Sequence, residues 1–161
     1  MQSFAAEDIS DRLDHYEAAF RSKDGPTIKV KITSTKFTRT RHELDADTGT
    51  VDGKRIYGVD GVPREGTDVI NLFEITFGDK LVKVPSKLWG DCFNPTLRSP
   101  AINPTLPDYG QVGSLEVFIS PDRTKVSIMM DGYRSASAPY RVVWIVQRDN
   151  HGSRFIEAVE P

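Results

Sequence analysis

Cys92 is the only cysteine of the chain and its first candidate nucleophile. A cysteine thiolate attacks esters or amides when a neighbouring base, such as His42 or His151, takes its proton. Its surroundings, "WGDCFNP", match no catalytic cysteine motif, and the sequence has no G-x-S-x-G turn for a serine nucleophile. We therefore interpret Cys92 as a structural thiol, because free cysteines pack mostly as small apolar residues.

Carboxylates are a second possible source of hydrolytic chemistry. Two acids about 5 to 10 Å apart across one cleft can cleave a glycosidic bond. Any two of the acids Glu65, Glu74, Asp91 and Glu116 could face one cleft, but sequence spacing does not test this. A small hydrolase acting on a glycan or an ester, with acids near Asp91 and Asp131 or with Cys92, is therefore the alternative hypothesis.

The sequence predicts no metal site and no cofactor. The three histidines are far apart, and neither a CxxC nor an HExxH pattern occurs. Asp45, Asp47 and Asp52 form an acidic loop, but Gly49 and Ile56 stand at the fifth and twelfth positions, where an EF-hand needs oxygen ligands from its side chains. The glycines lie singly in turns, so the chain has no glycine-rich phosphate loop.

Residues 27–41 form a basic segment without a single acid; its cations are Lys29, Lys31, Lys36, Arg39 and Arg41. If one strand ran through the whole segment, most of these cations would share a face that could contact a phosphate backbone. The net charge of −2 and the scarcity of aromatic residues there favour a solvated or edge strand instead. A nucleic-acid-binding module is the weaker alternative.

Aromatic side chains lie in or beside the segments expected to be loops, and they are the candidate binding residues. They are Trp89, Phe93, Tyr109 and Tyr133, together with Arg134. Aromatic residues on a rigid scaffold provide recognition surfaces for proteins or sugars. The leading hypothesis is a non-enzymatic binding or accessory domain that recognises a protein or glycan partner through loops 86–110 and 131–139.

The elements that must position these residues begin with an expected helix. Ile9, Leu13, Tyr16 and Phe20 recur at helical spacing, and Asp24-Gly25-Pro26 ends the segment. This pattern predicts one amphipathic helix over about residues 5–22.

A β domain is expected over about residues 27–159. Alternating apolar residues predict a first strand from residue 27, and Asp-Gly pairs flank a short strand at 54–57. Gly78-Asp79 predicts a hairpin of 68–77 with 80–84. Ser86 can cap one or two helical turns, and four prolines make 94–110 an ordered loop.

The last third of the chain predicts an antiparallel meander. Its expected strands are 115–119, 126–130, 140–147 and 154–159. The most apolar of them, 140–147, should be covered on both faces or lie centrally in its sheet. The predicted fold is a mainly β, single-domain antiparallel sandwich or partly open barrel of about seven strands, with one N-terminal helix.

Composition places the chain among ordinary globular domains. Its 161 residues are 38% hydrophobic and 27% charged, enough for one domain over 1–161 with its own core. No apolar run approaches the roughly 20 residues of a membrane-spanning helix. A single cysteine allows a cytoplasmic protein, while "SFAAED" is typical of a signal-cleavage junction and indicates an exported, mature form.

Three stretches carry a resemblance: "IYGVDGVP", "LFEITFGDKLVKVPSKLWGDCFNP" and "YRVVWIVQRDNHGSRFIE". Together they resemble a pattern in small uncharacterised bacterial β-rich proteins, often exported, over roughly the last two-thirds of the chain. The shared features are a turn, a hairpin ending in Val-Pro, a short helical segment and a closing hairpin with a tryptophan. The resemblance implies an architecture and no activity.

Overall fold

The computed structural model describes residues 2–3, 8–9, 15–97, 115–132 and 139–158, and this part of the chain is mainly β. The first antiparallel sheet, sheet A, has the order β1 (Gln2–Ser3), β10 (Leu115–Ile119), β11 (Lys125–Asp131), β12 (Tyr140–Gln147) and β13 (Gly152–Ala158). Sheet B has the order β2 (Asp8–Ile9), β3 (His15–Phe20), β4 (Ile28–Lys36), β8 (Asp68–Phe77) and β9 (Lys80–Lys83). A small third sheet joins β5 (Leu44–Asp45), β6 (Thr50–Val51) and β7 (Lys54–Arg55).

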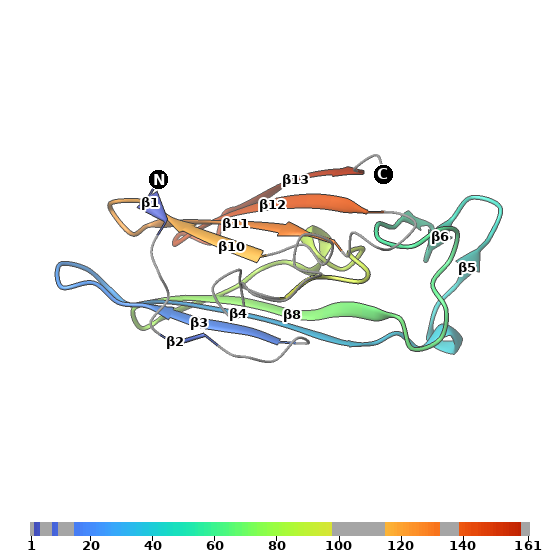
Figure 1. The fold of residues 1–161 in the computed structure, drawn as a ribbon, viewed down its shortest axis with the longest axis horizontal. Helices are drawn as coiled ribbons and strands as arrows, with labels where there is room; N and C mark the ends of the chain where they lie inside the picture. Colours follow the sequence, from blue (N-terminus) through green and yellow to red (C-terminus); the bar gives the residue numbers. More distant parts are fainter. Residues whose placement is uncertain (1, 4–7, 10–14, 98–114, 133–138, 159–161) are drawn as a thin grey trace, which may run out of the picture.

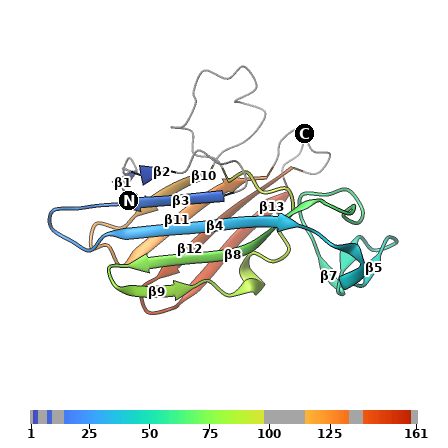
Figure 2. The same cartoon turned by 90° about the horizontal axis from the view of Figure 1, so that it is seen from below.

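Sheets A and B lie face to face as two layers, and the third sheet projects from one end (Figures 1 and 2). Alternate residues of the strands in both layers point inward and form one apolar core. At its centre the ring of Phe73 from β8 meets the ring of Trp144 from β12 edge-on, with centroids 5.1 Å apart. None of the sheets closes on itself within the described residues.

The expected strands of the last two-thirds are confirmed within a residue or two. The hairpin at Gly78-Asp79 joins β8 to β9, and a short 3-10 helix, η2 (Ser86–Leu88), follows the Val-Pro pair. Strand β12 lies between β11 and β13, with one side in the core and the other half-buried. Of the proline-rich loop, residues 98–110 lie outside the described part of the chain.

The predicted N-terminal helix is wrong where the structure describes it, because His15–Phe20 is strand β3. Tyr16, Ala18 and Phe20 point into the core, and β3 pairs antiparallel with β4. Residues four apart share a face in a helix and also in a strand, so the spacing of Tyr16 and Phe20 fits both. Pairing with the long strand β4 decides in favour of the strand.

The basic face expected over residues 27–41 also differs from the structure. Strand β4 ends at Lys36, and a second 3-10 helix, η1 (Arg39–Arg41), follows, so the cations do not continue along one strand. Within sheet B, Lys31 lies between Glu17 of β3 and Glu74 of β8, and Glu74 lies beside Lys83 of β9. This row of alternating charges, the charge ladder, neutralises the centre of the basic segment.

Arg123 joins the two layers at the end away from the third sheet. It lies in the turn between β10 and β11, is buried, and donates from Nε to the carbonyl of Pro26 at 2.8 Å. Its Nη2 donates to the carbonyl of Phe20, the last residue of β3 in the other sheet. A side chain added at Gly25 would collide with the side chain of Arg123, so glycine is needed there.

No helix among the described residues has the length and apolar character to cross a membrane.

Candidate functional site

A cleft of about 670 Å³ lies beside the third sheet. That sheet projects from one end of the two layers (Figure 1). The walls of the cleft come from the end of β4, the start of β8, β6 and β7, the segment 86–93, and β13. Its lining includes the side chains of Phe37, His42, Val51, Asp52, Lys54, Arg55, Ile56, Tyr57, Val69, Ile70, Lys87, Trp89, Asp91, Phe93 and Arg154. Segments far apart in the sequence therefore meet at one concave surface.

The floor of the cleft is a second apolar cluster, separate from the main core. It contains Phe37, Val51, Ile56 and Phe93, all buried. The rings of Phe37 and Phe93 meet edge-on with centroids 5.2 Å apart. The ring of Phe37 also stacks on His42 at 4.7 Å, so an imidazole covers one side of the floor.

Tyr140 of β12 fixes the floor from beneath. Its hydroxyl, wholly buried, donates to the carbonyl of Phe93 at 2.8 Å, and burial raises the pKa of this phenol. Gly58 leaves room for that bond: it has φ +90°, and a Cβ there would lie 2.2 Å from the Phe93 oxygen. The backbone of Tyr57 bonds to Asp91 and to Phe93, which attaches the strand-like segment at 57 to the segment at 91–93.

Asp91 and Arg154 form the strongest polar contact in the cleft. Both terminal nitrogens of the guanidinium donate to the carboxylate, and Nη2 lies 2.7 Å from Oδ2. Each of the two side chains is 18% exposed. Arg154 Nη1 also donates to the Leu88 carbonyl at 3.1 Å. The hydrogen bond to Asp91 raises the pKa of Arg154, so the guanidinium stays charged and the pair forms a fixed wall of the cleft.

Trp89 lies at the mouth of the cleft, half-buried, and is held by the turn that precedes it. Its indole N–H donates to the carbonyl of Val84 at 2.8 Å, and its backbone N–H bonds to Ser86. The ring packs against the main core as well as lining the cleft. A rigid aromatic edge of this kind presents apolar surface without loss of side-chain freedom on binding.

Tyr57 carries two guanidinium groups near its ring. Arg55 lies 5.1 Å and Arg154 6.0 Å from the ring centroid. Contacts of cations with an aromatic face are attractive, and they aim both arginines along the cleft.

The rim of the cleft has a surplus of positive charge. Lys54, Arg55 and Lys87 are exposed, and none of them forms an ion pair with another residue in the described part of the chain. The two acids of the lining are both paired, Asp91 with Arg154 and Asp52 with His42 at 2.7 Å. The bond from His42 is the main reason why the pKa of Asp52 is lowered, so this carboxylate stays charged.

Cys92 lies directly behind the cleft and is 0% exposed. Burial raises the pKa of its thiol far above the usual range, and the charge of Asp91 raises it further. The thiol therefore stays protonated and out of reach of a substrate, which does not favour a nucleophilic role.

The acids of the alternative hypothesis do not converge. Asp131 pairs with Arg141, Nε to Oδ1 at 2.7 Å. Arg141 stands between the core residues Tyr140 and Val142 in β12, so this pair lies on the outer side of sheet A. Asp91 belongs to the cleft, on the inner side. Among the described residues, the two carboxylates therefore lie on opposite sides of sheet A and share no cleft.

The predicted binding residues are divided by this geometry. Trp89 and Phe93 both line the cleft, Trp89 at its mouth and Phe93 in its floor. Tyr109, Tyr133 and Arg134 lie outside the described residues. Sequence reasoning missed Arg154 and Arg55, because nothing in the sequence links an arginine in a closing strand to an aspartate 63 residues earlier.

No group of three or more potential metal-ligating side chains gathers within the described part of the chain. Comparison of the sequence and fold with protein-family models, curated proteins and solved structures finds no match. The interpretation of the cleft therefore depends on its own chemistry.

Proposed function

We propose that the protein is a non-enzymatic binding domain, built as a β-sandwich, that recognises a protein partner through this cleft. The observation that carries the proposal is the combination of an apolar floor with a rim of exposed cations, which form no ion pair with another described residue. Binding sites are typically concave, largely apolar and equipped with a few placed polar groups. The fixed pair Asp91–Arg154 gives such a site a rigid wall.

The aliphatic lining favours a peptide segment over a glycan. Val51 of the floor, together with Val69 and Ile70, lines the cleft with aliphatic side chains, which suit an apolar side chain better than a hydroxylated sugar ring. Sugars commonly lie on an open aromatic face, whereas the ring of Tyr57 already has Arg55 and Arg154 near it.

The charge of the rim selects an acidic segment. Lys54, Arg55 and Lys87 attract carboxylates while the chain as a whole has a net charge of −2. Complementary charges raise the association rate and exclude basic competitors. We therefore propose a partner segment that combines Asp or Glu residues with an apolar anchor.

Three labelled peptides test this function in a fluorescence-anisotropy titration: alternating Glu and Leu, alternating Glu and Ser, and alternating Lys and Leu. The Glu–Leu peptide should bind most tightly. Added salt should weaken its binding, because the cations of the rim are exposed and salt screens exposed charges. The Glu–Ser peptide should bind more weakly because it lacks the anchor. Reversal of two rim charges, Lys54→Glu with Arg55→Glu, should lower the affinity for the Glu–Leu peptide about tenfold or more.

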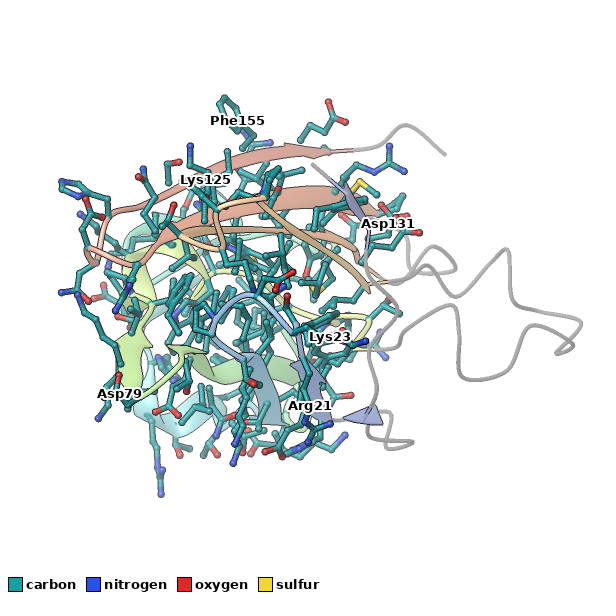
Figure 3. The ribbon with its side chains drawn as sticks, turned by 90° about the vertical axis from the view of Figure 1, so that its left-hand side faces the viewer. Arg21, Lys23, Asp79, Lys125, Asp131 and Phe155 are labelled. Atoms are coloured by element: carbon teal, nitrogen blue, oxygen red, sulfur yellow. The ribbon has the colours of Figure 1, made fainter. Side chains whose placement is uncertain are left out.

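The matched control is Lys23→Glu with Lys29→Glu, which changes the net charge equally. Both lysines are exposed and belong to the β3–β4 hairpin, Lys23 in the turn away from the cleft and Lys29 in β4 (Figures 1 and 3). If both double variants weakened binding of the Glu–Leu peptide equally, only net charge would matter, and the cleft would not be the binding site. Preferential binding of an acidic polysaccharide such as polygalacturonate would contradict a protein partner.

A further inference from the structure

Strand β13 is an open edge of sheet A. It is the last strand of the sheet, and no other described strand pairs with its outer side. Most of its residues are exposed, and the ring of Phe155 is 69% exposed. Figure 3 shows Phe155 projecting away from the two layers.

The other sheet ends are protected in ways that β13 is not. Strand β9 has only four residues, carries Lys80 and Lys83 at its ends and precedes Pro85, while β1 and β2 have two residues each. Short strands, lysines and prolines are the usual means by which proteins prevent edge pairing. Strand β13 has seven residues without lysine or proline, and its one arginine is engaged with Asp91 in the cleft.

The backbone groups on this edge can be assigned from the register. Gln147 N–H bonds to the His151 carbonyl at 2.8 Å, so the odd-numbered residues of β13 face β12. The N–H and C=O groups of Gly152, Arg154, Ile156 and Ala158 therefore point to the open edge. They form a regular row that a further antiparallel strand can meet.

We propose that a second copy of this chain pairs antiparallel along β13, with the two-fold axis at Phe155. In this register Phe155 lies opposite Phe155 of the other copy, and Arg154 exchanges hydrogen bonds with Ile156. Glu157 lies opposite Ser153, so no two like charges oppose each other. The strand is thus complementary to itself, which a two-fold interface requires.

The outer face of sheet A is a reason to expect a second copy of this chain, rather than an unrelated strand, as the partner of β13. Met129, Val143 and Phe155 form an apolar row across β11, β12 and β13, and this row stops at the exposed edge. When two copies pair about Phe155, the apolar row of one copy continues into the row of the other, in the order Phe155, Val143 and Met129. The pairing also covers the ring of Phe155. Because such an axis is perpendicular to the sheet, both clefts face the same side. The pairing itself requires no ligand in the cleft and stands independently of the proposed function.

Disulfide trapping tests the register directly. Phe155→Cys places two thiols opposite each other at a non-hydrogen-bonded pair, where Cα atoms lie about 4.5 Å apart, close enough for a disulfide. Mild oxidation should give a cross-linked dimer. Leu81→Cys is the matched control, since Leu81 is the other exposed large apolar residue described and lies on edge strand β9. Native Cys92 is buried and takes no part.

Charge exchange supplies a second readout by light scattering. The wild-type mass should rise toward that of a dimer with concentration, while Phe155→Glu and Phe155→Lys should each remain monomeric. An equimolar mixture of the two variants should form a heterodimer, because their charges are opposite at the axis. Circular dichroism should show that both variants are folded. A wild-type chain that stays monomeric at high concentration, with Phe155→Cys cross-linking no faster than Leu81→Cys, would overturn the second copy as the occupant of this edge.

Discussion

Asp91 has a thiol on one side and a guanidinium on the other, and the guanidinium determines its role. Arg154 holds both carboxylate oxygens, while the Cys92 thiol is buried behind the carboxylate. The neighbours Trp89, Asp91 and Phe93 were predictable as one group because they are close in the sequence. Arg154 was not, since pairing across sheets leaves no local pattern.

Native Cys92 should be almost inert to a thiol reagent such as DTNB. Its raised pKa leaves little thiolate at pH 8, and its burial excludes the reagent. The measurement is the absorbance of released thionitrobenzoate for the folded chain and for the chain in denaturant. Leu81→Cys, with an exposed thiol on edge strand β9, is the positive control. Rapid modification of the folded wild type would reopen the nucleophilic role.

Removal of one member of the Asp91–Arg154 pair should destabilise the protein. Asp91→Asn leaves a largely buried guanidinium without its counter-ion, and we expect a loss of about 2 kcal/mol in the free energy of unfolding. Arg154→Met should have a similar effect. Denaturant titration of both variants and of the double variant gives the coupling free energy between the two side chains. Additive losses would mean that the two side chains act independently.

At the scale of elements, local patterns were sufficient where a turn or an alternation specified the strand. Gly78-Asp79 predicted the β8–β9 hairpin, alternation predicted β10 and β11, and a continuous apolar run predicted β12. The pattern failed over His15–Phe20, where four-residue spacing is shared by helices and strands. Only the partner strand β4 distinguishes the two, and pairing of that kind is not written in a single window of sequence.

The charge ladder on sheet B should contribute measurably to stability. Lys31→Glu would place three acids side by side, Glu17, residue 31 and Glu74, across β3, β4 and β8. We expect a loss of about 1 kcal/mol at low salt that shrinks as salt is added. Lys29→Glu is the control, because its neighbours are Ala19 and Thr76, and it should change stability little. Thermal unfolding at two salt concentrations separates the variants.

At the scale of the whole molecule, the layers are joined at both ends and through the middle. Arg123 links the turns at one end, Phe73 meets Trp144 in the core, and the Leu88 carbonyl accepts bonds from Trp144 and Arg154 near the cleft. None of these links could be read from the sequence, because each connects segments that are distant along the chain. They indicate that the two sheets and the cleft segment unfold together.

The chain should therefore unfold in one cooperative transition, as the predicted single domain requires. Its two tryptophans report on different places: Trp144 on the contact between the layers and Trp89 on the cleft segment. Trp89→Phe and Trp144→Phe each leave one fluorescent reporter. In each variant the fluorescence midpoint in urea should coincide with the midpoint from far-ultraviolet circular dichroism. If Trp89 fluorescence changed at a lower urea concentration than the circular dichroism, the cleft segment would open separately from the sheets, and the rigid wall on which the proposed binding site depends would not exist.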